Sequence, residues 1–467
     1  MTGLLQGAPA RAIDALEERL EGDLYRPDDD GWDEARTPWN LAVDQRPAAV
    51  VLAESAADVA ETVLAARADG LRVAPQGTGH AAAPLGDLAG TILLRTTRMH
   101  GVEVDPQARR ARVEAGAVWQ EVTDAAAEHG LAALAGSSHD VGVLGYSLGG
   151  GLSWLARKHG LAANTILAAE IVDADGRIRR VDADNDPELF WALRGGGGSF
   201  AIVTAVELRL FPITEVFAGV LFFPVERAQD VLEAWLDWTE TVPDEVTSCG
   251  RIMRFPALPD VPEPLRGNAF ALVEAVFLTS PEAANAALAP LRALGPAMDT
   301  FRVMPARELS TLHMDPPHAV PGVGDGLLLD RVEPATIEAI VDAAGADSGS
   351  SLLSVELRQL GGAVGRTEPG AGAATFADAS FAIFAVGIAA TPELHAASER
   401  DSARVVAAVA PWDAGRDYMN FRETRSTGAR LFSAAIHERL AEIKRRVDPR
   451  DLIRSNHPVL QPTVSSS

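Results

Sequence analysis

The chain has 467 residues, of which 47% are hydrophobic and 23% charged, an ordinary composition for a folded globular protein. At about 100–200 residues per domain, this length predicts two or three domains. The formal net charge of -24 repels nucleic-acid phosphates and anionic lipids, so neither kind of partner is expected. The single cysteine, Cys249, excludes an intrachain disulfide and a cysteine-rich metal site, and we predict no bound metal.

The N-terminal stretch MTGLLQGAPARAIDALEERL has no basic region before a hydrophobic block, so we expect no signal peptide. The chain contains no run of about 20 hydrophobic residues, which argues against a spanning helix. We therefore expect a cytoplasmic protein.

The first half of the chain begins with a predicted strand–helix–strand unit. A helix is expected near residues 9–20, and RPAAVVLAE predicts a strand after it. SAADVAETVLAARADG has helical spacing, with Ser55 as the N-cap, Asp58 three residues later and Gly70 at its end. LRVAP predicts the second strand, and two strands joined through a helix normally run in parallel.

Shorter elements fill the chain as far as residue 212. We expect strands in TILLR, GVEVD and RARVEAG, a helix over about 118–129 and a glycine-rich run around 142–151. ILAAEIVDADGRIRRVDA predicts a hairpin, because two hydrophobic runs meet at Asp175-Gly176. A short helix, a four-glycine turn and a strand are expected in ELFWALRGGGGSFAIVTAVELRLFPI.

From about residue 213, long hydrophobic strands alternate with amphipathic helices. The strands are expected in VFAGVLFFP, FALVEAVFLT, SLLSVELRQL and SFAIFAVGIAA, and the helices near 225–240, 281–293, 333–345 and 392–410. This pattern predicts an antiparallel sheet backed by helices, in an α+β fold. The tail predicts a further helix that ends before Pro449.

Two glycine-rich loops are candidate ligand sites, and three kinds of site use such loops. The first loop, Gly77 to Ala82, fits the G-x-G-x-x-A fingerprint of a nicotinamide dinucleotide site. That fingerprint needs a helix directly after it. Pro84, Gly86 and Gly90 oppose a helix there, so this interpretation is disfavoured.

A serine hydrolase is the second interpretation. Gly145 to Gly149 matches the G-x-S-x-G nucleophile elbow around Ser147, and His437 or His457 would supply the base. The glycines at 149–151 would weaken the helix that must hold the serine, each by about 1 kcal/mol relative to alanine. The hydrolase is kept as an alternative.

A flavin site is the third interpretation and the favoured one. The loops around 76–80 and 142–151 could converge on one diphosphate, because glycine lets backbone N–H groups approach phosphate oxygens without a lysine. His80 would then lie where the flavin ring begins. A neutral imidazole is a competent nucleophile near pH 7.

Three segments carry a family resemblance: VAPQGTGH, HDVGVLGYSLGGGLSWLARKHGLAANTIL and ADGRIRRVDADNDPELFWALRGGGGSFAIVT. They resemble the flavin domain of the vanillyl-alcohol-oxidase superfamily, and more narrowly the berberine-bridge-enzyme-like FAD-linked oxidoreductases. DYMNF and KRRVDPRDLIRSNHPV resemble the C-terminal signature of that group. The resemblance covers about residues 39–212 and 415–460, and it matches the middle of the chain mainly through VELRQLGGAVGR.

The resemblance implies an α+β protein with a two-subdomain, PCMH-type FAD-binding domain over residues 1–212, whose core spans about 39–212. A substrate-binding domain of antiparallel sheet backed by helices is expected over 213–411. The C-terminal segment, 412–467, is expected to return to the FAD-binding domain.

The resemblance also implies how the flavin is held. His80 matches the histidine that is covalently linked to FAD, whereas Ser138 stands where many members have a second, cysteinyl link, so we expect a single tether. Tyr146 and Ala82 also depart from residues common in relatives, which favours the singly tethered amine, alcohol or natural-product oxidases. The expected cofactor-binding residues are Pro75, Gln76, Gly77, Thr78, Gly79, His80, Ser138, Val141, Gly142, Gly145, Gly149, Ile202, Val203, Tyr418 and Asn420.

Catalytic candidates come from two segments. Tyr418 in DYMNF matches a position that faces the flavin, as a base or proton relay, although a buried structural tyrosine is an equal alternative. Glu356 and Arg358 alternate on one strand and so share a face. If that face lines the pocket, Glu356 is a base or a substrate anchor; if it meets water, both are surface charges. His313 and His318 are expected to be loop residues, and Trp39 and Trp154 to fill core space.

The function expected from the resemblance is that of an FAD-dependent oxidase. Such an enzyme removes a hydride from an alcohol, an amine or a natural-product C–H bond and passes the electrons to O2, giving H2O2. A small-molecule substrate and a monomer or homodimer are expected. Besides the hydrolase, a non-catalytic flavin-binding protein is the remaining alternative.

Overall fold

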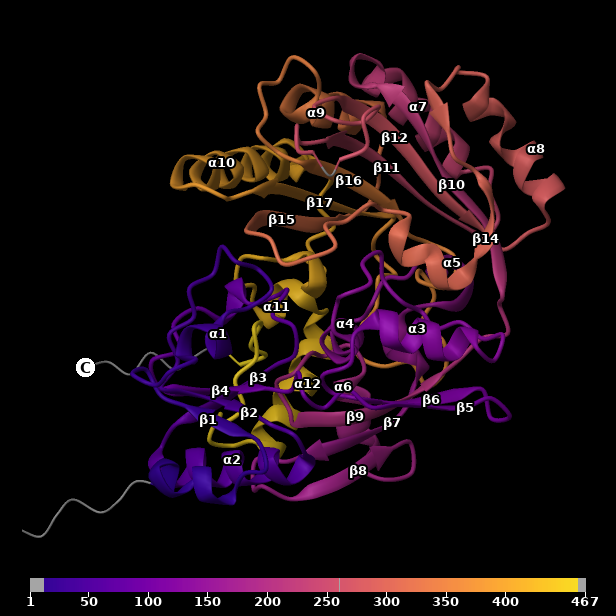
Figure 1. The fold of residues 1–467 in the computed structure, drawn as a ribbon. Coiled ribbons are helices and arrows are strands. Elements are labelled where there is room, and N and C mark those ends of the chain that lie inside the picture. Colours follow the sequence, from indigo (N-terminus) through magenta and orange to yellow (C-terminus); the bar gives the residue numbers. More distant parts are fainter. Residues whose placement is uncertain (1–11, 260, 461–467) are drawn as a thin grey trace, which may run out of the picture.

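The computed structural model describes residues 12–259 and 261–460, and the strands of this part of the chain form three sheets (Figure 1). The first sheet has the order β1-β2-β4-β3, and its strands are β1 Asp23–Tyr25, β2 Ala49–Leu52, β3 Arg72–Gln76 and β4 Thr91–Arg95. The helix α2 Ala56–Asp69 packs against it, and α1 Trp32–Arg36 lies nearby.

The predicted strand–helix–strand unit is present, with one difference. β2 and β3 run in the same direction, but β4 lies between them and pairs in parallel with both. All five residues of β4 are buried, and a strand of this kind is stabilised in the middle of a sheet, where both of its faces are covered. Ser55 caps α2 by accepting a hydrogen bond from Asp58 N, and Gly70 ends the helix with a left-handed φ of 69°.

The second sheet is antiparallel and has the order β5-β6-β9-β7-β8. The predicted hairpin forms β7 and β8, joined across Gly176 with φ 79°. The strands are β5 Val102–Asp105, β6 Arg110–Glu114, β7 Ile166–Val172, β8 Ile178–Asp182 and β9 Ile202–Arg209. The helices of this region are α3 Trp119–Ala127, α4 Val143–Leu148, α5 Ala156–His159 and α6 Pro187–Leu193.

The third sheet is the large one, and its strands lie in the upper half of Figure 1. Its main path is β13-β10-β12-β11-β16-β17-β15, and β14 also pairs with β10. The strands are β10 Glu215–Pro224, β11 Val246–Arg254, β12 Ala269–Phe277, β13 Met298–Asp299, β14 Arg302–Pro305, β15 Gly322–Leu329, β16 Ser354–Gln359 and β17 Phe381–Ile388. Antiparallel pairing and backing helices confirm the predicted architecture of this region.

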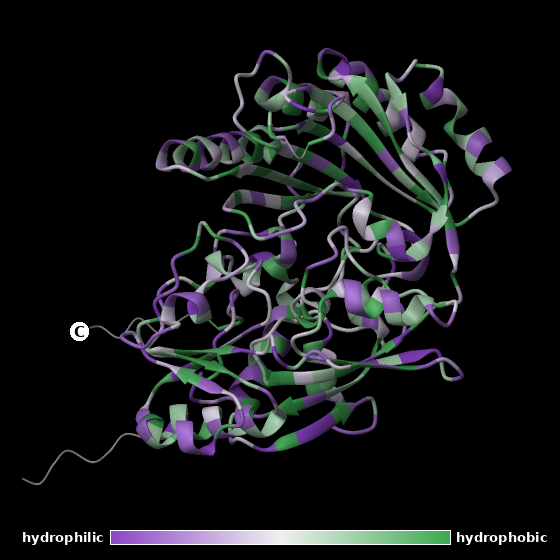
Figure 2. Cartoon of the chain, in the orientation of Figure 1, coloured by the Kyte–Doolittle hydropathy of each residue, from purple (hydrophilic) through white to green (hydrophobic). Residues whose placement is uncertain are grey.

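Helices cover one face of the large sheet and leave the other toward the lower half of the molecule (Figure 1). The covering helices are α7 Ala228–Thr239, α8 Pro281–Arg292, α9 Pro334–Ala344 and α10 Pro392–Ala408, all close to their predicted positions. Trp235, Ile337 and Val405 from three of them pack with alternate strand residues in one hydrophobic core. Figure 2 shows hydrophobic residues gathered along the strands and hydrophilic residues on the outer helices.

The C-terminal segment runs from the large sheet back to the lower half (yellow in Figure 1). It contains α11 Gly428–Leu431 and α12 Ala434–Val447, which ends shortly before Pro449 as predicted. Leu440 and Ile443 of α12 lie in the same hydrophobic core as Phe200 and Val206. The tail is therefore part of the core of the second sheet region.

Two expectations about helices need comment. Residues 12–20 form only short 3-10 turns, Ala12–Ala15 and Glu17–Arg19, and residues 9–11 of the expected first helix lie outside the described residues. After the first glycine loop, only a 3-10 turn at Ala83–Leu85 forms. The helix that a nicotinamide fingerprint requires is missing from that place in the described chain. Within the described residues, no helix combines the length and the hydrophobicity needed to cross a membrane.

Candidate functional site

The two glycine loops meet in space, as the flavin interpretation requires. A Cβ on Gly142 would lie 3.6 Å from Thr78 Oγ1, which places the second loop against the first. A Cβ on Gly77 would lie 3.6 Å from the carbonyl oxygen of Ala115, and Trp119 N donates to Val141 O. The turn around residues 115–119 therefore holds both loops. It also pairs with the start of β9, where Ala115 N donates to Thr204 O.

The imidazole of His80 is held on three sides. Its ring stacks on Trp39, with centroids 4.0 Å apart and an interplanar angle of 18°. Its Nδ1 lies 2.8 Å from Thr78 Oγ1, and its Nε2 lies 3.5 Å from Asp140 Oδ1. Nε2 is buried and has no hydrogen-bond partner among the described residues. Nδ1 of His80 is therefore hydrogen-bonded, whereas Nε2 lies beside the Asp140 carboxylate without a hydrogen bond to any described residue.

Asp140 connects the residues around His80. Trp39 Nε1 donates to its Oδ2 at 2.5 Å, and Ser138 Oγ donates to its Oδ1 at 2.9 Å. Burial raises the pKa of this carboxyl, but the neighbouring His80, Trp39 and Ser138 outweigh that effect and hold the pKa at about 2. Asp140 is therefore a fixed negative charge beside the imidazole. Trp39 was expected to fill core space and instead forms part of this site.

Gly79 makes the first loop possible. It has a φ of 88°, in the left-handed region, and a Cβ there would lie 2.7 Å from Pro38 Cβ. Gln76, at the end of β3, is 7% exposed, and neither polar atom of its amide has a hydrogen-bond partner in the described chain. Buried amide groups are normally paired, so these orphan atoms and His80 Nε2 fit a site that a polar ligand completes.

The C-terminal segment brings Tyr418 and Asn420 to the second loop. Asn420 Nδ2 donates to Tyr146 O and to the Tyr418 hydroxyl, each at 3.0 Å. A Cβ on Gly149 would lie 1.9 Å from Asn420 Oδ1, so glycine is needed for this approach. Tyr418 is 1% exposed, and burial raises the pKa of its phenol to about 12. The hydroxyl is therefore protonated at neutral pH.

A network of buried charges lies on the face of the large sheet that the helices leave uncovered. The imidazole of His313 donates through Nδ1 to Glu274 at 2.6 Å and through Nε2 to Glu356. The Nε of Arg358 donates to the other oxygen of Glu356 at 2.9 Å, and Arg251 pairs with Glu274. Both carboxylates and His313 are at most 4% exposed at their side chains.

The charged residues of this network set the protonation states of one another. Burial and Arg251 lower the pKa of His313, but Glu274, Glu356 and Asp315 outweigh them and raise it to about 9. Burial raises the pKa of Glu356, yet Arg358 and His313 hold it well below its usual range. His313 is therefore a cation and Glu356 an anion at neutral pH. His313 lies in a turn outside the helices and strands, as predicted, but its place in a buried charged network was not foreseen.

Arg358 joins this network to the second glycine loop. Its Nη2 donates to Ser137 Oγ at 3.1 Å, one residue before Ser138. Its guanidinium lies over the rings of Trp154 and Phe421, at 5.7 Å and 5.1 Å from their centroids. Phe421 follows Asn420 directly. Segment 137–149 therefore contacts the residues around His80, the hydrogen-bonded residues Tyr418 and Asn420, and the charged network around His313.

The remaining predicted residues have less distinctive surroundings. Pro75 lies within β3, and Val141 and Gly145 lie in or beside α4, with open space next to Gly145. Ile202 and Val203 are almost fully buried, and their side chains pack in different hydrophobic cores. Only their backbones are therefore available for a ligand. Gln359 points away from Glu356 and accepts from Ser248 on the helix-covered face.

The hydrolase interpretation lacks a base. Ser147 Oγ is buried and has no hydrogen-bond partner within residues 12–259 and 261–460. His437 Nε2 donates to Val459 O at 2.8 Å. The ring nitrogens of His457 are occupied by Ser426 N and Arg422 O. Neither imidazole activates the serine.

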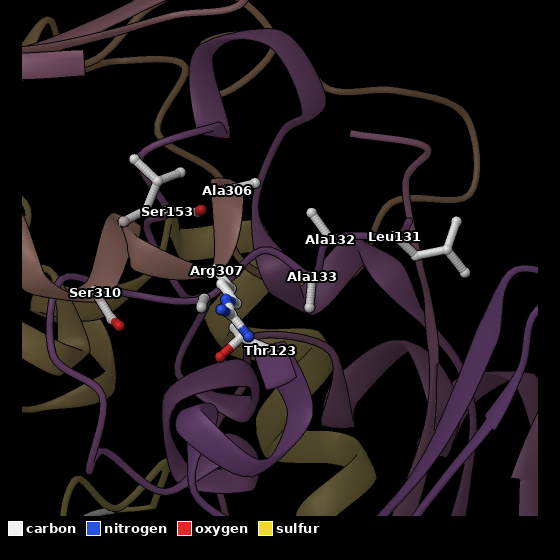
Figure 3. A pocket seen from close by; sticks show the side chains of 10 residues that line it. Thr123, Leu131, Ala132, Ala133, Ser153, Ala306, Arg307 and Ser310 are labelled. Atoms are coloured by element: carbon white, nitrogen blue, oxygen red, sulfur yellow. The ribbon is translucent and has the colours of Figure 1, made fainter. Parts of the chain in front are cut away.

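A small crevice between α3 and the turn Ala306–Thr311 is lined by Thr123, Ala132, Ser153 and Arg307, among others (Figure 3). Its free volume is about 10 Å³. That is about the space of one water molecule, so this crevice does not hold a substrate.

Sequence profiles identify two parts of the chain. Residues 47–182 match the family described as "FAD binding domain", and residues 417–459 match "Berberine and berberine like". The first match contains both glycine loops and His80, and the second begins at Asp417, one residue before Tyr418.

Curated relatives and solved structures agree with these matches. The chain is 29% identical to (R)-6-hydroxynicotine oxidase of Paenarthrobacter nicotinovorans over 94% of this chain and 97% of the relative. It is 33% identical to glucooligosaccharide oxidase of Sarocladium strictum, over about half of each protein (50% and 48%).

Among solved structures, 6-hydroxy-D-nicotine oxidase of Arthrobacter nicotinovorans has a TM-score of 0.79 and 25% identity, covering 93% of this chain and 96% of that one. Berberine bridge enzyme from Eschscholzia californica has a TM-score of 0.81 at 17% identity, with coverage of 96% and 98%, and so shows the shared fold.

Proposed function

Since this chain is a berberine-bridge-enzyme-like, FAD-linked oxidoreductase, we propose that it is an oxidase with FAD attached covalently to His80. When bound, FAD accepts a hydride from the substrate and passes two electrons to O2, giving H2O2. The substrate is a small molecule with an oxidisable alcohol, amine or activated C–H group. The names of the relatives, a hydroxynicotine oxidase and a glucooligosaccharide oxidase, support this range.

The tether assignment is supported by Nε2 of His80, which is buried and has no hydrogen-bond partner among the described residues. If Nδ1–H donates to Thr78 Oγ1, the lone pair of Nε2 is left available for a bond to carbon. Stacking on Trp39 fixes the plane of the ring, and the carboxylate of Asp140 stabilises positive charge that develops on it. With Ser138 in place of a second nucleophile, we propose one covalent link only.

The diphosphate would be held by backbone N–H groups of Gln76–Gly79 and of the 138–149 loop. This needs glycine at the close approaches but no lysine. The backbone at Ile202 and Val203 would border the adenine end. Gln76, with an unpaired buried amide, would contribute a polar contact to the same ligand.

Tyr418 is proposed as the proton relay for the substrate. With a pKa near 12, its phenol is a hydrogen-bond donor at neutral pH and not a phenolate base. Asn420 donates to the phenol oxygen and so directs the phenol proton elsewhere. Glu356 has both oxygens engaged by His313 and Arg358, which supports a role as the residue that positions Arg358.

The single observation that carries this proposal is the convergence of His80, Tyr418 and Asn420 on one glycine-rich segment, 138–149. The test is rapid mixing of oxidised holoenzyme with substrate under anaerobic conditions, after a screen of alcohols, amines and sugars that detects H2O2. Tyr418→Phe should retain flavin and reduce it about 100-fold more slowly, the usual contribution of a proton-transfer residue. Tyr25→Phe, far along the chain in β1, is the matched control. An unchanged rate of reduction in Tyr418→Phe would remove Tyr418 from the mechanism.

A further inference from the structure

A second, larger cleft lies away from the glycine loops. It has a free volume of about 520 Å³, within the usual range of small-ligand sites. Its walls come from α5, the start of β7, the end of α6 and the end of β9 on one side. The other side is the loop at residues 363–371, which leaves β16 of the large sheet. None of the lining residues belongs to either glycine loop.

The lining of this cleft is strongly cationic in an acidic protein. Lys158, Arg194, Arg209 and Arg366 line it, against one acidic residue, Glu368, among the lining residues. Lys158 pairs with Glu245 at 2.7 Å and Arg366 with Asp244 at 2.9 Å, and neither acid lines the cleft. Within residues 12–259 and 261–460, Arg194, which is half-buried, and Arg209, which is exposed, form no ion pair.

Arg194 is the more constrained of the two unpaired cations. Its guanidinium lies 4.3 Å from the centre of the Phe190 ring, and its Nε is buried without a hydrogen-bond partner among residues 12–259 and 261–460. Burial lowers the pKa of Arg194, as expected for a cation that lacks a counter-ion. A stacked guanidinium with free N–H groups has the geometry that accepts an oxyanion.

We propose that this cleft binds a small molecule that carries a phosphate group. Two unpaired guanidinium groups match the charge of about -1.5 to -2 that a phosphate monoester carries near pH 7, whereas one carboxylate would leave a cation uncompensated. The net charge of -24 repels long polyanions such as nucleic acid. A small anion inside the cleft responds to the cations within a Debye length of about 10 Å.

A bound anion would lie between the helices and strands of residues 158–211 and the loop at residues 363–371. Across the cleft, Asn164 Oδ1 accepts from Gly372 N and Arg194 O accepts from Ala373 N. The same loop continues to Phe376, whose ring packs against Tyr418 with centroids 5.0 Å apart. This loop therefore connects the cleft to a ring that packs against Tyr418, next to the proposed site of oxidation.

The test is calorimetric titration of the flavin-loaded protein with pyrophosphate at low ionic strength. Loaded protein is used because the diphosphate of FAD then occupies the glycine loops. The expected result is saturable binding that weakens with added salt. Arg209→Ala should weaken it about tenfold or more, the usual loss for a charge-assisted hydrogen bond, and Arg307→Ala, an exposed arginine outside the cleft, should not.

Three results would overturn the proposal. The first is binding that does not saturate below about 10 mM, well above the micromolar to millimolar affinities of ordinary metabolite sites. The second is equal affinity for pyrophosphate in the wild type and in the double variant Arg194→Gln/Arg209→Ala. The third is tighter binding of citrate than of pyrophosphate. Since the readout is heat of binding, it is independent of whether the protein oxidises any substrate. Retention of the flavin spectrum in each variant checks that the fold survives.

Discussion

At the scale of single residues, the buried charges around His313 are the most demanding feature of the molecule. A charge taken out of water is tolerated only when it is paired and hydrogen-bonded, and here the imidazolium lies between two carboxylates. Arg251 and Arg358 complete the pairing. The cluster therefore must form when the large sheet folds, and it also holds Arg358 in position.

The charge of His313 predicts how stability depends on pH. Its pKa is raised from 6.5 to about 9 in the folded state, so the folded protein binds the proton more tightly than the unfolded chain. The stabilisation is complete below pH 6.5 and is lost as the pH rises to about 9; by linkage it amounts to ~3 kcal/mol. Urea unfolding from pH 6 to pH 9.5 should show this decline.

Substitution of the same residue checks the cause. His313→Gln leaves Glu274 and Glu356 without their shared cation, which should destabilise the protein by about 3–5 kcal/mol and flatten the slope between pH 6.5 and 9. The exposed His129→Gln is the control and should keep the wild-type slope. A wild-type slope in His313→Gln would show that another group titrates.

The sequence could not predict this cluster from His313, because the residue lies in a proline-rich loop without periodicity. A signal was nevertheless present in the strands: Arg251, Glu274 and Glu356 are charged residues inside otherwise hydrophobic segments. Charges in buried strands must be paired, so a search for their common partner could have pointed to a histidine. Trp39 was missed because no local pattern shows that its ring meets His80.

At the scale of secondary-structure elements, local signals predicted most helices and strands correctly. Caps such as Ser55, Ser280 and Thr391 lie at the start of their helices, and Asp175-Gly176 forms the expected hairpin turn. The place of β4 between β2 and β3 was not predictable, because pairing order depends on which strand gains most from burial on both faces. The division at residues 212 and 412 stays a prediction.

The start of α2 yields a prediction of its own. Asp58 does not return to Ser55 N; its carboxylate accepts from Glu21 N, Gly22 N and Glu54 N at 2.8–3.0 Å. Asp58→Ala leaves three backbone N–H donors without their shared acceptor and should cost about 2–4 kcal/mol, whereas Ser55→Ala removes one cap and should cost about 1 kcal/mol. Urea unfolding of both variants measures the difference. Equal costs would contradict the role assigned to Asp58.

At the scale of the whole molecule, the C-terminal segment holds the first and second sheets together. The fully buried Lys444 donates through Nζ to Ser199 O, Asp448 and Ile453 O at 2.6–3.1 Å. Ser199 follows the four-glycine turn and precedes β9. One ammonium group therefore fixes the returning tail to the turn beside the proposed adenine end.

Removal of that ammonium should be costly. Lys444→Met leaves Asp448 as an unpaired buried charge and should destabilise the protein by about 3–5 kcal/mol. Arg445→Met, on the exposed side of the same helix, should change stability by less than about 0.5 kcal/mol. Thermal unfolding of the two variants makes the comparison. Similar melting temperatures would contradict the role assigned to the Lys444 ammonium group.

The central claim is that His80 carries the flavin, and one measurement tests it most directly. The purified wild type and His80→Ala are precipitated with acid, and the absorption spectra of pellet and supernatant are recorded. We expect a yellow wild-type pellet and, for His80→Ala, flavin only in the supernatant. Flavin released from the wild type, or retained in the pellet of His80→Ala, would contradict the account.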